Sequence, residues 1–357
     1  MSRACLRGKV PAGAEGSFCP VPFAQLELQP TGNISPCCWL ERVKLGNART
    51  HSLEEAWNSP RLRAIRREFL AGEPRTCRRR MREVGCHRLF EQLLDKVALT
   101  EVQERPPLRY DLRLNGRCSL KCRMCRVWKQ PSGAWDGSWF WVEGPQALFP
   151  AVMEMDVLGG EPFIQDDTFR LIDAVAAVSP GCTWAFSTNA AYAFSPRLTD
   201  ALDKVRIRWL QVSLDAVEPA TYAAIRRGGS LERTLGCLDA FIAYRDRRAA
   251  AGDGFTLMVS MCVQKANWAE IPAFLRFARE RELHPLLQYA FGPMPLSLTA
   301  LPVREQRRVA AFLEEHVPPA DHLAVAPILD PLKAFLRRPL HHVLARLYAF
   351  ARRASRA

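Results

Sequence analysis

The stretch Cys118-Ser119-Leu120-Lys121-Cys122-Arg123-Met124-Cys125 carries three cysteines with the spacing C-x3-C-x2-C. Three thiolates on one short loop can hold three irons of a cubane [4Fe–4S] cluster and leave the fourth iron without a protein ligand. An iron of this kind is free to bind a cofactor or substrate and to take part in its chemistry. A structural zinc site normally receives all four of its ligands from the protein. The loop therefore indicates a reactive iron–sulfur centre.

A second motif follows the cysteine loop, at the end of an apolar segment. Residues 153–158 read as a strand and lead into Gly159-Gly160-Glu161-Pro162-Phe163. Glycines suit a close approach of the backbone to a ligand, because no Cβ intervenes. Buried or zinc-binding cysteines beside a chance turn are the alternative, but the order of the two motifs favours a shared cofactor site.

Together these two motifs resemble the radical S-adenosylmethionine (SAM) superfamily. The resemblance implies that Cys118, Cys122 and Cys125 hold a [4Fe–4S] cluster whose open iron binds SAM. It further implies that reductive cleavage of SAM gives a 5′-deoxyadenosyl radical, which abstracts hydrogen from a substrate. The residues that the resemblance assigns to SAM are Met124, Gly159, Gly160, Glu161, Asn189, Ser213 and Arg226.

These assignments differ in role. The glycine turn and its glutamate are expected to take the amino group of SAM, and Met124 to pack against adenine. Ser213 and Arg226 are expected at the carboxylate, which a guanidinium can bind through two hydrogen bonds. Asn189 is assigned to the ribose or the carboxylate, although Ala190 replaces the glycine that often follows. Strand-end caps and salt bridges are the alternative for these polar residues.

The segment from about 107 to 291 alternates between strand and helix patterns, which predicts a parallel α/β sheet. The predicted strands are Tyr110–Leu114, Met153–Leu158, Thr183–Ser187, Trp209–Leu214, Thr256–Val263 and Leu286–Ala290. The predicted helices are Phe169–Val178, Ser195–Val205, Pro219–Arg226, Leu231–Ala249 and Trp268–Arg281. By resemblance this is a partial (β/α)6 TIM-like barrel, with functional groups at the carboxyl ends of its strands.

A second set of cysteines precedes this segment. A hairpin turn at Pro30–Gly32 presents cysteines, and more follow a helix, so thiolates from distant points can close a second cubane. The pattern resembles the SPASM/twitch domains, which hold auxiliary clusters. Arg80 stands where that pattern expects a cysteine. The predicted ligands are Cys19, Cys37, Cys77 and Cys86, with Cys38 as a substitute, and a zinc ribbon is the alternative.

The chain thus divides into three predicted parts: a small N-terminal α+β iron–sulfur domain (1–100), the barrel (101–292) and a C-terminal helical extension (293–357). In the extension, Arg304–His316 and Leu340–Arg353 read as amphipathic helices, with prolines marking the breaks between them.

Composition excludes some classes of protein. The chain has 357 residues, of which 48% are hydrophobic, and no run of about eighteen apolar residues that could span a membrane. Twelve cysteines without a secretory signal indicate thiolate ligands in a reducing compartment, hence the cytoplasm. The net charge of +13 could attract nucleic acid, but no aromatic-interleaved motif accompanies it, so nucleic acid is not expected as a partner.

Two further features have two interpretations each. Four tryptophans between 128 and 141 could line a substrate mouth or anchor a long loop by packing. Cys262 lies near the end of a predicted strand, where its thiol could donate a hydrogen atom to a substrate radical, and buried packing is the alternative.

The sequence therefore predicts a radical SAM enzyme, with peptide modification as its leading function. A dehydrogenase or rearrangement enzyme acting on a carbohydrate-like or amino-acid substrate is the alternative, and a non-catalytic zinc-binding protein is a third. The expected partners are an electron donor such as flavodoxin or ferredoxin, and a peptide or small-molecule substrate. No membrane partner is expected.

Overall fold

The computed structural model describes residues 17–78, 91–290 and 292–336, together with residues 8, 10, 11, 14, 81 and 86. The chain forms two compact units. The first unit comprises the described residues of Met1–Cys118, Val127–Phe186 and Ser195–Arg208. The second unit comprises those of Ser119–Arg126, Ser187–Phe194 and Trp209–Ala357.

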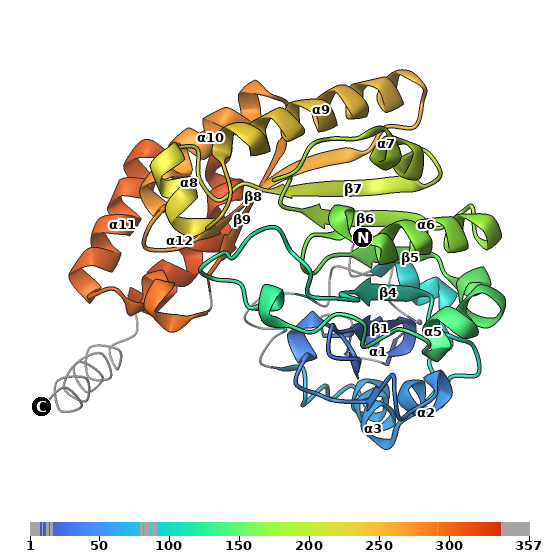
Figure 1. Ribbon diagram of the computed structural model, residues 1–357. Helices are drawn as coiled ribbons and strands as arrows, with labels where there is room; N and C mark the ends of the chain where they lie inside the picture. The colour runs from blue at the N-terminus through green and yellow to red at the C-terminus, as the bar shows by residue number, and fades with distance from the viewer. Residues whose placement is uncertain are drawn as a thin grey trace, which may run out of the picture. The chain divides into compact units, whose positions relative to one another are not determined.

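The first unit is built on strands in the order β3-β2-β1-β4-β5-β6 (Figure 1). The strands pair antiparallel from β3 to β1 and parallel from β1 to β6. Their bounds are β1 Gln25–Leu28, β2 Asn33–Ser35, β3 Gly46–Asn47, β4 Arg109–Leu112, β5 Glu154–Val157 and β6 Thr183–Thr188. The helices are α1 Val21–Ala24, α2 Leu53–Trp57, α3 Pro60–Leu70, α5 Trp139–Val142, α6 Asp166–Val178 and α7 Pro196–Leu202.

The predicted hairpin is present, and its first strand extends the parallel sheet. Gly32 turns the chain with φ +78°, a conformation that L side chains rarely adopt, and β1 and β2 then pair antiparallel. On its other edge β1 runs parallel to β4, with Glu27 opposite Asp111. The N-terminal hairpin and the first predicted barrel strand therefore belong to one continuous hydrogen-bonded sheet.

The helices of this N-terminal region begin at defined capping residues. Ser52 and Glu55 form a capping box at the start of α2, each side chain hydrogen-bonding the backbone N–H of the other. On α3, Arg66 is fully buried and donates to the carbonyls of Pro22 and Trp57. Burial lowers the pKa of this arginine to about 9. These hydrogen bonds tie α3 to α1, which directly precedes β1, and to the end of α2.

The second unit contains parallel strands in the order β7-β8-β9, with helices between them. The bounds are β7 Arg206–Ser213, α8 Pro219–Ile225, α9 Leu231–Ala250, β8 Thr256–Val263, α10 Ile271–Glu280, β9 His284–Tyr289, α11 Val303–His316 and α12 His322–Leu336. The first three residues of β7 fall in the first unit.

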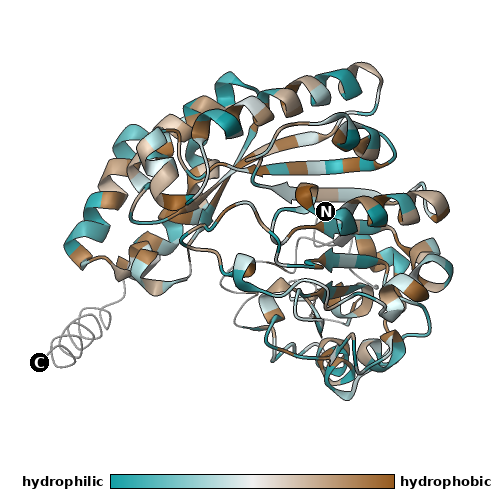
Figure 2. Ribbon diagram, viewed as in Figure 1, coloured by the Kyte–Doolittle hydropathy of each residue, from teal (hydrophilic) through white to brown (hydrophobic). Residues whose placement is uncertain are grey.

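Helix α9 shows why these segments pack as helices. Its buried side chains, among them Leu231, Leu238 and Phe241, recur every three or four residues and form one apolar stripe. Its exposed residues include Glu232, Arg233 and Asp239, and Figure 2 shows hydrophilic and hydrophobic residues alternating along it. Ser230 caps its start by accepting a hydrogen bond from the backbone N–H of Arg233.

The observed elements confirm the predicted α/β class with parallel strands. One prediction about the C-terminal extension is wrong: Pro327 and Pro331 lie inside α12 and do not break it. The apolar face of α12 buries Ile328 and Leu332, and this packing offsets the lost backbone hydrogen bonds. The predicted helix Leu340–Arg353 lies outside the described residues, and the three-part division of the chain stays a prediction.

Two further observations bear on the sequence analysis. Trp135, Trp139 and Trp141 are buried, and the ring of Phe140 lies edge-on to all three of them. This part of the tryptophan-rich stretch is therefore packing, as one of the two interpretations predicted. In the part of the chain that the structure describes, no helix is long and apolar enough to cross a membrane.

Candidate metal and cofactor sites

The glycine turn after β5 lies directly against the residue that precedes Cys118. Gly160 has φ +59°, and a Cβ on it would lie 2.2 Å from the carbonyl oxygen of Arg117. The backbone N–H of Glu161 donates to this same oxygen at 2.9 Å. Because any side chain at Gly160 would collide with the backbone, the contact requires glycine. The first unit thus brings the glycine turn to the start of the cysteine loop.

Side chains fix this turn from both sides. Glu161 is fully buried, and its carboxylate accepts a hydrogen bond from the backbone N–H of Phe163 at 3.1 Å. The amide nitrogen of Gln165 donates to the carbonyls of Arg117 at 2.8 Å and Gly159 at 3.2 Å. The turn and the residue before Cys118 are therefore held as one rigid element.

In the second unit, the loop that carries Cys122 and Cys125 is attached to the end of α8. The backbone N–H of Lys121 donates to the carbonyl oxygen of Arg227 at 2.9 Å, and that of Arg123 donates to the carbonyl oxygen of Ile225 at 3.0 Å. The N–H of Cys125 donates to the carbonyl of Cys122 at 3.2 Å, which closes a turn. Both thiols are half-buried.

Arg226, at the end of α8, is buried beside this loop. Its guanidinium forms an ion pair with Asp215 at 2.8 Å, with 5% and 2% of the two side chains exposed. Burial alone would lower the pKa of Arg226, but the charges of Asp215 and of the Cys122 thiol outweigh burial and raise it. Among the described residues its buried Nε has no hydrogen-bond partner. A guanidinium with an unused donor fits a carboxylate ligand.

Asp215 connects this pair to β8. It has φ +65°, and its carboxylate accepts a hydrogen bond from the backbone N–H of Cys262 at 2.7 Å. Burial raises the pKa of the Cys262 thiol to about 12, and the charge of Asp215 adds to the effect. The thiol therefore keeps its proton at neutral pH, which hydrogen-atom donation requires. That role stays a prediction.

The remaining predicted SAM residues of the second unit lie at strand ends or in the loop. Asn189 follows β6, donates to the hydroxyl of Ser119 at 3.3 Å and accepts from the N–H of Ala191 at 2.8 Å. Ala190 has φ +52°, so an alanine occupies the left-handed conformation that glycine favours. Ser213 ends β7, and Met124 is half-buried in the turn of the cysteine loop.

The four N-terminal cysteines predicted as ligands lie close together in the first unit. Cys19 belongs to an apolar cluster with Phe18, Phe23 and Phe69, and Cys37, Cys77 and Cys86 pack against it. Burial raises the pKa of the Cys19 thiol, and the charges of Cys77 and Cys86 raise it further. Burial also raises the pKa of the Cys37 thiol, and the charges of Cys38, Cys19 and Cys77 raise it further. Thiols this buried bind a metal only by losing their protons.

Cys38 has a different environment from its neighbour. It is close enough to Asp111, Glu27 and Asp156 for their charges to act on its thiol. Arg80, where the pattern expects a cysteine, lies outside the described residues. The structure thus gathers Cys37 with the other three predicted ligands and places Cys38 beside an acidic group.

These thiol sets fit iron–sulfur clusters in the chemistry of their donors, which is purely thiolate. Within the described residues, no three or more His, Cys, Asp or Glu side chains are arranged to hold a single metal ion. The ligand assignments of all seven cysteines remain predictions.

Two features of these sites were missed in the sequence. One is the pairing of Asp215 with Arg226, for which the sequence offers no signal, since eleven positions and a helix separate them. The other is a row of acids on adjacent strands. Three strand segments share the pattern polar-apolar-acid-apolar, and this repeat could have revealed the row: Gln25–Leu28, Arg109–Leu112 and Glu154–Val157.

Comparison with known proteins gives family matches for two segments of this chain. Residues 112–278 match the radical SAM superfamily, and residues 19–80 match the SPASM iron–sulfur cluster-binding domain. The chain is similar to GTP 3′,8-cyclases of Marinobacter nauticus (29% identity over 125 residues) and Pseudomonas entomophila (30% over 125). Each alignment covers 35% of this chain and 35% of the relative, so the chain spans about a third of the length of these curated relatives.

Solved structures give more distant likenesses. Streptococcus suis SuiB aligns with 67% of this chain and 51% of its own, at 16% identity and a TM-score of 0.42. The structure of anSMEcpe with bound AdoMet and the Cp18Cys peptide aligns with 63% of this chain and 67% of its own, at 14% identity and a TM-score of 0.44. Likenesses at this level say nothing about the substrate of this chain.

Proposed function

Because this chain belongs to the radical SAM superfamily and carries a SPASM iron–sulfur domain, we propose that it cleaves SAM to remove a hydrogen atom from a substrate. The observation that carries the proposal is the contact between the Glu161 N–H and the Arg117 carbonyl at 2.9 Å. It fixes the glycine turn against the residue that precedes Cys118. A turn and a cysteine loop held in this way suit one shared ligand.

Cys118, Cys122 and Cys125 are proposed to hold the cluster. Within the first unit, the buried carboxylate of Glu161 in the turn Gly159–Glu161 suits an ammonium group. Within the second unit, Arg226 has an unused donor for a carboxylate. When bound, the [4Fe–4S] cluster supplies the electron that breaks a carbon–sulfur bond of SAM.

Three other residues of the second unit are also proposed to bind SAM. Met124 packs against the adenine, Ser213 hydrogen-bonds the carboxylate, and Asn189 bonds the ribose or carboxylate. Asn189 has limited freedom, because its side chain already bonds Ser119 and Ala191. A preorganised side chain loses little conformational entropy when its ligand binds.

The first unit's four cysteines are proposed to hold an auxiliary cluster. Cys19 belongs to an apolar cluster, Cys37, Cys77 and Cys86 pack against it, and burial raises the pKa values of the Cys19 and Cys37 thiols. The auxiliary cluster could accept an electron from the substrate radical. An external donor such as flavodoxin or ferredoxin would then supply the electron for SAM cleavage.

The leading substrate is a peptide, and a small alcohol or amino-acid-like metabolite is the alternative. The GTP 3′,8-cyclases that the chain resembles are named for GTP, a nucleoside triphosphate. An anionic substrate of that kind is disfavoured near the acids Glu27, Asp111 and Asp156 of the first unit, because like charges repel in a buried setting.

Metal analysis and SAM cleavage test this function. Anaerobically purified protein should hold about eight irons with matching sulfide if two cubanes are present. With dithionite and SAM it should form 5′-deoxyadenosine. Zinc without iron would contradict the proposal and favour a zinc-binding protein. Iron without 5′-deoxyadenosine would contradict the SAM-cleaving role.

A further inference from the structure

Three carboxylates lie side by side across the strands of the first unit. Glu27 on β1 is opposite Asp111 on β4, and Asp111 is opposite Asp156 on β5. Each occupies the third position of its strand, so all three side chains point to the same face of the sheet. Neighbouring parallel strands are about 4.8 Å apart, which makes this a row of close like charges. We call these three residues the acidic row.

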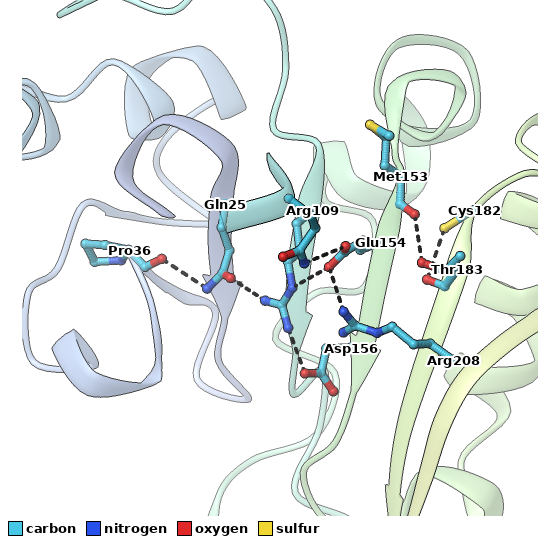
Figure 3. Close-up of polar contacts among 10 residues, drawn as sticks. Gln25, Pro36, Arg109, Met153, Glu154, Asp156, Cys182, Thr183 and Arg208 are labelled. Carbon is cyan, nitrogen blue, oxygen red and sulfur yellow. Dashed lines mark hydrogen bonds and ion pairs between the residues drawn. The ribbon is translucent and has the colours of Figure 1, made fainter. Parts of the chain in front are cut away.

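Two residues earlier on the same strands, the charges are balanced. Arg109 donates to Glu154 at 3.2 Å and to Asp156 at 2.8 Å, and it also bonds Gln25 (Figure 3). Arg208, which is 36% exposed, lies 3.6 Å from Glu154. Glu154, the carboxylate of this layer, therefore has two guanidiniums beside it, and Arg109 also pairs with Asp156 at one end of the acidic row.

One end of the acidic row is also satisfied. Glu27 is fully buried, accepts a hydrogen bond from Ser35, and forms an ion pair with Arg113 at 3.0 Å. Arg113 also lies against the glycine turn, because a Cβ on Gly159 would be 2.7 Å from its own Cβ. The row therefore adjoins the turn that is proposed to bind SAM.

Asp111, in the middle of the row, differs from its two neighbours because it forms no ion pair among the described residues. It is 5% exposed, and its buried Oδ1 has no hydrogen-bond partner there. One buried oxygen of Glu27 and one of Asp156 also lack a hydrogen bond, but both of those residues are ion-paired with an arginine. Five carboxylates, with Asp111 among them, meet three guanidiniums here, and each guanidinium is ion-paired to another acid. Burial lowers the pKa of Arg113, but the charges of Asp111 and Glu27 outweigh burial and raise it, so Asp111 has a nearby countercharge and lacks a hydrogen-bond donor at Oδ1. Native proteins leave few buried polar atoms without a hydrogen-bond partner.

Two side chains at the row are partly exposed. The side chains of Asp156 and Arg113 are 14% and 18% exposed, and Cys38, which the row influences, is exposed. No group of His, Cys, Asp or Glu in the described residues is arranged for a single metal ion. An organic cation, which spreads its donors over several ångströms, matches a row of acceptors better than a metal ion does.

We propose that the acidic row is a binding subsite for a cationic group, an ammonium or guanidinium, carried by the organic substrate. The cation would lie against Asp111 and supply the hydrogen-bond donor that this carboxylate lacks. The identification of the ligand as substrate rests on the proposed function. The binding itself needs neither a reduced cluster nor SAM cleavage.

Thermal unfolding with matched ligands tests the subsite. Cluster-loaded full-length protein is titrated anaerobically with pentylamine and with pentanol, its neutral counterpart. Pentylamine should raise the Tm, and pentanol should not. In Asp111→Asn, which keeps the shape and removes the charge, the apparent affinity for pentylamine should fall at least about tenfold, since charge-assisted hydrogen bonds are worth about 1.5–3 kcal/mol. Asp173→Asn is the control, because Asp173 is 60% exposed on α6 and should leave the response unchanged.

The stability of the free variant separates a binding role from a structural one. Asp111→Asn should unfold at or above the Tm of the wild type, because it removes one of three adjacent like charges and leaves Arg113 paired with Glu27. A lower Tm in this variant would assign Asp111 to structure and overturn the proposal. It would also be overturned by equal shifts with pentanol, by an unchanged amine response in the variant, or by a response to MgCl2 alone. Formation of 5′-deoxyadenosine, measured separately, shows whether the proposed function itself fails.

Discussion

The two groups of cysteines in this chain have opposite surroundings. In the first unit, Cys19, Cys37, Cys77 and Cys86 pack with phenylalanine rings, and no guanidinium of the described residues acts on the Cys19 thiol. In the second unit, the Cys122 thiol lies near Arg226, which is paired with Asp215. An apolar pocket suits a cluster that only exchanges electrons, whereas a charged, hydrogen-bonding wall suits a cluster that must also bind a polar ligand.

From this contrast we expect substitutions in the two groups of cysteines to differ in their effect on SAM cleavage. Removing a thiol of the Cys118–Cys125 loop should end the chemistry, and removing one of the four N-terminal thiols should leave SAM cleavage in place. The effects expected of single substitutions run from loss of activity to a small gain in stability.

The largest effect is expected from Cys122→Ala. Loss of one of only three thiolates should prevent assembly of the SAM-binding cluster, so 5′-deoxyadenosine formation should fall at least about 100-fold, to background. The assay is product quantification after reaction with dithionite and SAM. Cys237→Ala is the control, since Cys237 is buried on α9 and should affect packing alone. Full activity in Cys122→Ala would invalidate the assignment of the loop.

Cys77→Ala should remove one cluster and keep the other. Iron should fall from about eight to about four per chain, while 5′-deoxyadenosine formation stays within a few-fold of wild type. The same substitution at Cys86 tests whether it completes the set in place of the missing cysteine at Arg80. Cys38→Ala, whose thiol lies by the acidic row, should keep all the iron. Iron loss in Cys38→Ala but not in Cys86→Ala would reverse the two assignments.

Asp215→Ala should destabilise the second unit. It leaves Arg226 buried without its partner, and breaking a buried ion pair in this way costs about 3–5 kcal/mol. Urea unfolding gives the change in free energy. Asp246→Ala serves for comparison, because Asp246 pairs with Arg245 at the surface and should change stability by less than about 1 kcal/mol. Equal losses of unfolding free energy in the two variants would show that the buried ion pair stabilises the protein no more than the Arg245–Asp246 pair does.

The smallest effect is expected at Ala190, beside Asn189. Its φ of +52° strains an alanine by roughly 1–2 kcal/mol, and glycine removes the strain at some cost in entropy. Ala190→Gly should therefore raise the free energy of unfolding by up to about 1 kcal/mol. Ala191→Gly, whose φ is not positive, should lower it instead. A destabilised Ala190→Gly variant would mean that this backbone conformation carries no strain.

The sequence predicted the elements of this fold better than their contacts. Periodicity located the six strands from β4 to β9, because alternating and continuous apolar runs report which residues are buried. It failed at Pro327 and Pro331, where packing of α12 offsets the local cost of proline. Long-range packing of this kind leaves no local trace in the sequence.

At the candidate site, too, local motifs could be predicted from the sequence and long-range contacts could not. Spacing identified the Cys118 loop and the glycine turn, since short-range geometry constrains both. It did not predict that β1 pairs with β4, and so it could not place Glu27 beside Asp111. The fold decides which charged residues pair, as Asp215 and Arg226 do. A carboxylate that lacks an ion-pair partner can therefore be recognised only in the three-dimensional structure.

The pairing of β1 with β4 has a consequence for dissecting this protein. Cutting the chain ahead of residue 101 would strip β4 of its neighbour and expose a bare row of amide and carbonyl groups. Arg109 would lose Gln25 in the same cut. An isolated barrel fragment should therefore self-associate rather than behave as a free-standing catalyst, and the N-terminal segment acts as a permanent cover for that edge.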